Sequence, residues 1–125
     1  MTPVVRTDFS DEARWGALCA AIATPSEEGF LASAGPVDDP AHRDLTTAQV
    51  VARFREARLV VVADAVTLGS EEMPLLFVDL REEPPGEIRV IPSQLWSIEN
   101  NLSLANMDFA EFADSVDDDG VFRGF

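Results

Sequence analysis

Short apolar runs along the chain predict a β-sheet of four to five strands. Leu59–Ala63 is apolar at every position, which is typical of a strand covered on both faces in an α/β fold. Glu87–Ile91 alternates between apolar and polar residues, and the turn-forming segment Glu82–Gly86 precedes it. We therefore expect a hairpin and a mixed sheet. The expected strands are Pro3–Thr7, Phe30–Ala34, Leu59–Ala63, Pro74–Leu80 and Glu87–Ile91.

Apolar residues at helical spacing predict three to four helices. Trp15, Leu18 and Ile22 form one apolar stripe after Ser10, which is a good N-cap. Two capping boxes mark further starts, Thr46 with Gln49 and Asp108 with Glu111. The expected helices are Asp11–Ala23, a second after Thr46, a third carrying Leu95 to Leu102 and a fourth from Asp108 to Val116, with Val66–Met73 as a polar loop. This order predicts an α/β domain of two or three layers, with helices covering a mixed sheet.

The length and cysteine content place one domain in a reducing compartment. A chain of 125 residues is near the commonest size for a single domain, so residues 1–125 are expected to form one unit. Cys19 is the only cysteine, so an intramolecular disulfide is excluded. No basic and apolar leader follows Met1, and no apolar run approaches the length of a membrane span. The sequence thus predicts a cytoplasmic protein.

The net charge of −14 narrows the possible partners. An acidic surface repels nucleic acid and anionic membranes and attracts basic proteins or cations. The charge is uneven: Ser93–Phe125 holds seven acidic residues and one arginine, whereas Pro40–Arg58 holds four arginines and two acidic residues. Every basic residue is arginine, which indicates a GC-rich bacterial genome. Simple solubility is the alternative explanation for the charge.

Polar residues gather unusually among apolar ones between Trp96 and Phe109. Asparagine is a poor helix former, so three of them at a helix-to-helix junction need a reason. One reason is structural: Asn100 or Asn101 ends the helix in a left-handed cap, and Asn106 bonds the turn. The other is a polar platform that binds a peptide or a small polar ligand. Its candidate binding residues are Trp96, Glu99, Asn100, Asn101, Asn106 and Asp108.

Three aspartates follow predicted strands and define an alternative site. Asp8, Asp64 and Asp79 would lie together if their strands were parallel, because ligands bind where the carboxyl ends of such strands meet. A few carboxylates with water bind Mg²⁺. Since aspartate is also a common cap and turn residue, a metal site here is the less favoured interpretation.

Other chemistry finds little support in the sequence. His42 is the only histidine and lies in a predicted loop, and Cys19 lies beside the apolar stripe of a helix. Asp117–Gly120 lacks the later acidic ligand of a calcium loop and is expected to be a solvated turn. The sequence shows no phosphate-binding loop and no paired-cysteine metal spacing, and it indicates no cofactor. The tail with Phe122 and Phe125 is expected to seal the core, with presentation to a partner as the alternative.

Three segments resemble a family of small, acidic bacterial proteins classed only as a domain of unknown function. These segments are Val5–Ser10, Trp96–Phe109 and Asp119–Phe125, and the likeness extends over nearly the whole chain. The resemblance implies a free-standing protein that ends at Phe125. Because no activity is assigned to that family, it implies no catalytic or binding residue.

The function favoured by the sequence is that of a non-enzymatic interaction module. Its acidic face would bind a protein partner with a basic surface, as immunity proteins and inhibitors of basic toxins or nucleases do. The first alternative is a small carboxylate-based enzyme or metal binder that uses Asp8, Asp64 and Asp79. The second alternative is a structural homo-oligomeric module.

Overall fold

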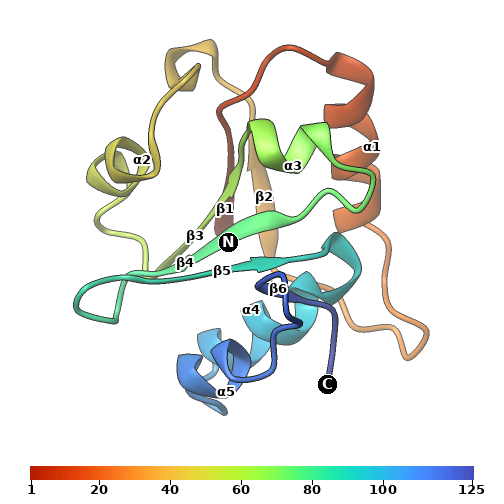
Figure 1. Ribbon diagram of the computed structural model, residues 1–125, viewed down its shortest axis with the longest axis vertical. Coiled ribbons are helices and arrows are strands. Elements are labelled where there is room, and N and C mark those ends of the chain that lie inside the picture. Colours follow the sequence, from red (N-terminus) through yellow and green to blue (C-terminus); the bar gives the residue numbers. More distant parts are fainter.

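The computed structural model describes all 125 residues as a mixed six-stranded sheet between two helical layers (Figure 1). The strand order is β2-β1-β3-β4-β5-β6, and β4 alone runs opposite to the other strands. The strands are β1 (Thr2–Arg6), β2 (Ala34–Val37), β3 (Leu59–Ala63), β4 (Leu75–Asp79), β5 (Gly86–Val90) and β6 (Val121–Phe122). The mixed α/β architecture and the β4–β5 hairpin are confirmed, with more strands than expected.

Five α-helices cover the two faces of the sheet unequally. In Figure 1, α2 lies to the left of the sheet and α1 to the right, with α4 and α5 below. They are α1 (Glu12–Ile22), α2 (Thr47–Arg53), α3 (Ala65–Gly69), α4 (Leu95–Ser103) and α5 (Phe109–Ala113), and 3-10 turns span Pro40–His42 and Pro92–Gln94. None of them is long and apolar enough to cross a lipid bilayer.

The central strands separate two apolar cores. Because successive side chains of a strand point to opposite faces, Val4 joins the core beneath α1 and α4, whereas Val5 joins the core beneath α2. The larger core includes Trp15, Leu18 and Ile22, so the apolar stripe expected in the first helix is confirmed. Every residue of β3 is buried, as its continuous apolar run predicts.

The predicted helix starts are mostly right, and each has a visible cause. Thr46 and Gln49 form the expected capping box of α2. In α1 the cap is Asp11 instead of Ser10, because the Asp11 carboxylate accepts the backbone N–H of Arg14 at 3.0 Å. The segment Val66–Met73 was expected to be a polar loop, but its first residues belong to α3. This helix starts there because Asp64 and Thr67 form a capping box that was not recognised in the sequence.

Two strands depart from the prediction. The strand expected over Phe30–Ala34 lies later, over Ala34–Val37, because Ser26–Phe30 closes a tight turn first. The tail contributes β6, which pairs in parallel with β5 through Val121 and Phe122. Phe122 is fully buried and seals the core, whereas Phe125 remains 75% exposed and touches the rings of Phe112 and Phe122. The expected sealing of the core is confirmed for Phe122, whereas presentation of Phe125 to a partner stays a prediction.

Candidate functional site

Glu99 is a buried structural centre of the predicted polar platform. Its side chain is 2% exposed. One carboxylate oxygen accepts the backbone N–H of Ser33 at 2.7 Å, and the other accepts the hydroxyls of Thr2, at 3.1 Å, and Ser103. A buried carboxylate needs such donors, because burial without them is costly. Glu99 therefore joins α4 to β1 and to the loop before β2, and it offers no free oxygen to a partner.

The asparagines do not end the helix as the sequence analysis considered. Asn100 and Asn101 lie inside α4, and the Asn101 side chain donates to the Ser97 carbonyl at 2.8 Å. The left-handed position belongs to Ala105, with a φ of 56°. The N–H of Asn106 bonds to the Asn101 carbonyl at 2.9 Å, and that of Ala105 to Leu102 at 3.2 Å. This pair of bonds is a Schellman motif, and it turns the chain from α4 toward α5.

The remaining platform residues point to two different places. Trp96 is half-buried and stacks on Phe30, with ring centroids 4.9 Å apart and planes 13° apart. Asn106 and Asp108 are exposed at the α4–α5 junction. The structure thus brings Asn106 and Asp108 together at the junction and leaves Trp96 near the start of α4.

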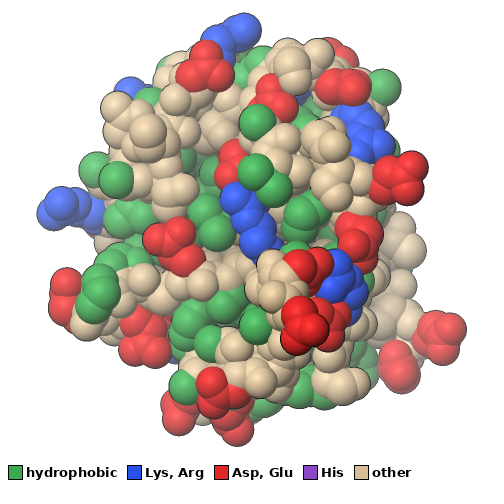
Figure 2. Space-filling view, viewed as in Figure 1, with side chains coloured by type: hydrophobic (Ala, Val, Ile, Leu, Met, Phe, Trp, Pro, Cys, Tyr) green, Lys and Arg blue, Asp and Glu red, His purple; other side chains and the backbone are tan.

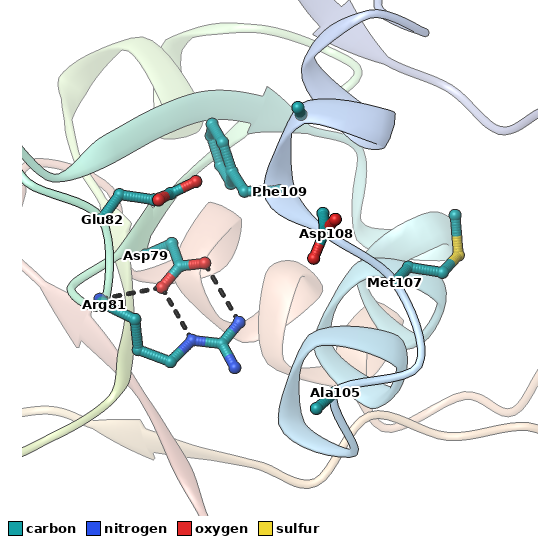
Figure 3. A pocket seen from close by; sticks show the side chains of 8 residues that line it. Asp79, Arg81, Glu82, Ala105, Met107, Asp108 and Phe109 are labelled. Carbon is teal, nitrogen blue, oxygen red and sulfur yellow. Dashed lines mark hydrogen bonds and ion pairs between the residues drawn. The ribbon is translucent and has the colours of Figure 1, made fainter.

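A hollow of about 500 Å³ lies where the α4–α5 junction faces the end of β4. Asp79 ends β4, and Arg81 and Glu82 begin the turn toward β5 (Figure 3). The lining residues are Asp79, Arg81, Glu82, Ala105, Met107, Asp108, Phe109 and Ala110. Asp108 is thus the one platform residue that lines it. We call this feature the hairpin–junction hollow.

The floor of the hollow is a closed ion pair. The Arg81 guanidinium binds both oxygens of Asp79 at 3.1 Å, and its other terminal nitrogen donates to the Leu102 carbonyl at 2.8 Å. The Asp79 carboxylate raises the pKa of Arg81 above its ordinary value. Asp79 is 2% exposed, whereas the Arg81 side chain is 30% exposed, so the pair joins a buried carboxylate to the surface and holds the hairpin against α4. The hydrogen bonds of Arg81 thus go to Asp79 and Leu102, and its charge acts on Glu82 and Asp108 without a direct ion pair.

The wall of the hollow carries carboxylates beside apolar side chains. Glu82 and Asp108 are exposed and form no ion pair with an arginine. The Phe109 ring packs against β5 where residue 86 is glycine, since a Cβ there would lie 2.6 Å from the ring. Met107 and Phe109 offer apolar contact to the stem of a long side chain, and the carboxylates offer oxygen acceptors to its charged end.

Sequence reasoning missed most of the hairpin–junction hollow. Only Asp79 and Asp108 were singled out, and Asp79 was assigned to another site. The lining residues come from two segments that are more than twenty positions apart, so no local pattern joins them. The one available signal was Asp79-x-Arg81, a spacing that lets an arginine fold back onto the preceding carboxylate.

Comparison with protein families settles where the chain belongs. A family model described as Domain of unknown function (DUF6924) matches residues 1–125. The chain belongs to this family. The resemblance noted in its sequence is thereby confirmed over the whole length. No curated protein matches the sequence. The DUF6924 description assigns no activity to its members.

In this DUF6924 chain the three strand-end aspartates do not converge. β1 and β3 are parallel, so Asp8 and Asp64 share a hollow of about 220 Å³ with Asp44. β4 is antiparallel to β3 and Asp79 pairs with Leu59, which places Asp79 at the opposite edge of the sheet. Both oxygens of Asp64 are bound by Arg89 at 2.9 Å. The predicted convergence is therefore wrong, because one strand runs the other way.

The other candidates of the DUF6924 chain are held in structural contacts. Burial raises the pKa of the Cys19 thiol, which makes it a weaker nucleophile. His42 is half-buried and its ring lies 5.6 Å from that of Phe54. In the acidic turn, Asp117 and Asp119 each bind Arg123 at 2.7 Å, and Glu72 binds it at 2.8 Å.

Proposed function

We propose that this protein is a non-enzymatic cytosolic interaction module whose acidic face binds a protein partner with a basic surface, in the manner of an immunity protein or inhibitor. The acidic face is the surface around the hairpin–junction hollow. Its exposed carboxylates come from the β4–β5 turn and the α4–α5 region, and they are Glu82, Glu83, Glu87, Asp108, Glu111 and Asp114. Acidic side chains are prominent along the lower edge of the molecule in Figure 2.

The observation that carries the proposal is the unpaired state of Glu82 and Asp108. The only arginine in the hollow, Arg81, is committed to Asp79 and to the Leu102 carbonyl. No basic residue occurs between Arg89 and Arg123. The charge of Arg81 also acts on Glu82 and Asp108, but the lining holds three carboxylates and one guanidinium, so the hollow keeps a net negative charge. A lysine or arginine of a partner would place its stem on Met107 and Phe109 and its charge between the two carboxylates.

The net charge supports fast and selective association. A net charge of −14 attracts a basic partner over a distance and repels nucleic acid. The Asp79–Arg81 pair and the Schellman motif at Ala105 hold the hairpin and the junction in place before a partner arrives. Such preorganisation lowers the cost of ordering on binding. Glu99 and Asn101 stabilise this arrangement from inside α4, and Asn106 and Asp108 would contact the partner at the surface.

The test is affinity capture with matched charge variants. Wild-type protein and the E82Q/D108N variant are immobilised, exposed to an extract of the cells that make the protein, and eluted along a salt gradient. We expect one basic protein to be retained by the wild type in stoichiometric amount and to leave at moderate salt, and E82Q/D108N to lose it. Asparagine still caps a helix, so D108N preserves the start of α5.

The control variant is E56Q/E71Q. It also neutralises two exposed carboxylates that form no ion pair, but neither lines the hollow. Retention by E56Q/E71Q together with loss by E82Q/D108N supports the proposal. Equal retention by both variants, or a column that retains no basic protein, contradicts it.

A further inference from the structure

The loop between α1 and β2 exposes two large apolar side chains. Phe30 is 50% exposed and Leu31 is 47% exposed, although both are large enough to contribute to a core. They follow Glu27 and Glu28, which are also exposed. In Figure 1 this loop projects at the lower right, and Figure 2 shows acidic side chains at its tip. We call Phe30 and Leu31 the loop patch.

The loop patch is held in a fixed shape. The backbone N–H of Ser26 bonds to the Phe30 carbonyl at 2.8 Å, and the Ser26 hydroxyl accepts the N–H of Phe30 at 3.0 Å. Gly29 permits this tight turn with a φ of 89°. Beyond the patch, the N–H of Ser33 bonds to the buried carboxylate of Glu99. Both ends of the patch are thus tied by hydrogen bonds.

Trp96 supports the loop patch from beneath. The Phe30 ring stacks on the Trp96 ring at 4.9 Å, and Trp96 lies one turn before Glu99 on α4. One helix therefore supplies both the aromatic support and the acid that fixes the loop. The arrangement keeps apolar area in water at a cost in stability, and exposed apolar groups held in this way are typical of interaction sites.

The charge around the loop patch indicates which kind of partner surface is complementary to it. Glu27 and Glu28 form no ion pair, and no arginine occurs between Arg14 and Arg43. A complementary surface has apolar side chains for Phe30 and Leu31 and basic side chains for the two glutamates. A second copy of this chain, with its net charge of −14, is a poor match for such a site.

We propose that the loop patch is the apolar anchor for an amphipathic basic segment of the protein partner. This inference rests on the proposed function, and it adds a second contact that depends on burial of apolar area instead of charge alone. The hairpin–junction hollow would bind basic side chains, and Phe30 and Leu31 would bind the apolar face of the same partner. Glu99 and Trp96 are positioning residues for this anchor.

The experiment uses two synthetic helical peptides of equal charge, one of leucine and lysine and one of alanine and lysine, because alanine keeps the helix while removing most of the apolar side chain. Binding is measured by calorimetry and by the emission of Trp96, with the W96F variant identifying its signal against that of Trp15. We expect the wild type to bind the leucine peptide at least about tenfold more tightly, since burial of one large side chain is enough for that ratio. The F30S/L31S variant should lose the preference.

The matched control is Val66→Ser, because Val66 is 55% exposed on α3, away from the loop. If F30S/L31S and V66S have the same affinity ratio as the wild type, the loop-patch inference is wrong. If E82Q/D108N binds both peptides as tightly as the wild type does, the proposed function is wrong instead. If the wild type forms a dimer that F30S/L31S abolishes, the occupant is a second copy and the proposed partner is overturned.

Discussion

The buried carboxylate of Glu99 on α4 accepts the backbone N–H of Ser33 at 2.7 Å, so one helix fixes the loop that enters an edge strand. The same carboxylate accepts hydroxyls from Thr2 and Ser103. Three donors from separate segments thus share one acceptor. Glu99, which the sequence analysis assigned to a polar platform for binding, therefore cross-links three segments inside the fold. It also fixes the loop that carries the exposed Phe30.

Removal of this tie should cost much of the stability. Glu99→Ala leaves three donors without an acceptor, from buried Thr2, half-buried Ser103 and the backbone of Ser33, and we expect a loss of about 3 kcal/mol in the free energy of unfolding, measured with urea. Glu99→Gln keeps one acceptor oxygen for Ser33 and should lose less. Asn106→Ala, at an exposed position, serves as control and should change stability by less than about 0.5 kcal/mol. A Glu99→Ala protein as stable as the Asn106→Ala protein would contradict this role.

Ala105→Gly should stabilise the protein. Ala105 occupies the left-handed position of the Schellman motif, with a φ of 56°, where a Cβ is unfavourable. Glycine removes that strain, and we expect a gain of about 1 kcal/mol in the free energy of unfolding, measured with urea. A loss of stability in Ala105→Gly would show that the motif tolerates alanine without strain.

The opposite substitution, Gly16→Ala, should also stabilise the protein by about 1 kcal/mol, because Gly16 lies inside α1 with open space around it.

Gly86→Ala should disturb the wall of the hairpin–junction hollow. The new Cβ would lie 2.6 Å from the Phe109 ring, so the ring has to move. We expect a loss of about 1–3 kcal/mol in stability and weaker binding of the lysine peptides. Combining Gly86→Ala with Phe109→Leu should restore part of the stability, because the smaller side chain leaves room. Additive losses in the double variant would mean that the two residues do not share this contact.

The Asp64–Arg89 pair should make stability fall in acid. Burial acts to raise the pKa of Asp64, but the Arg89 fork and the Thr67 N–H outweigh it, so the pKa lies below its ordinary value. The unfolded chain then binds the proton more readily, and the stability from this pair is present above about pH 4 and is lost as pH falls through the folded pKa. Asp64→Asn should cost about 2 kcal/mol at pH 7.

The measurement is urea unfolding of wild type and Asp64→Asn between about pH 7 and about pH 2. The difference between the two proteins should shrink toward the acid end. The Arg123 cluster also loses stability in acid, because Arg123 lowers the pKa of Glu72 and Asp119. The Arg123 cluster is present in both proteins, so its effect on the free energy of unfolding cancels when the two are compared. A difference that stays constant with pH would show that the charge of Asp64 contributes nothing.

Local signals in the sequence predicted most helices and strands. The predictions failed where the structure depends on contacts between segments that are distant in the sequence. The capping box of Thr46 and Gln49 and the apolar run of β3 need only neighbouring residues, and both predictions are confirmed. By contrast, β6 exists because Val121 and Phe122 pair with β5, which is about thirty positions earlier in the chain, and no local pattern reveals this pairing. The direction of β4 likewise decided that Asp79 lies far from Asp64. The hairpin–junction hollow was missed for the same reason.

The two outermost strands limit how a partner can be recognised. β2 has four residues and includes Pro36, which lacks an N–H, and β6 has only two residues. Neither edge offers a long row of free backbone donors and acceptors, so the sheet is a poor template for adding a strand from another chain. Sheet-to-sheet aggregation is discouraged by the same geometry. Recognition is therefore left to side chains, whose identity can change between related proteins while the scaffold remains the same.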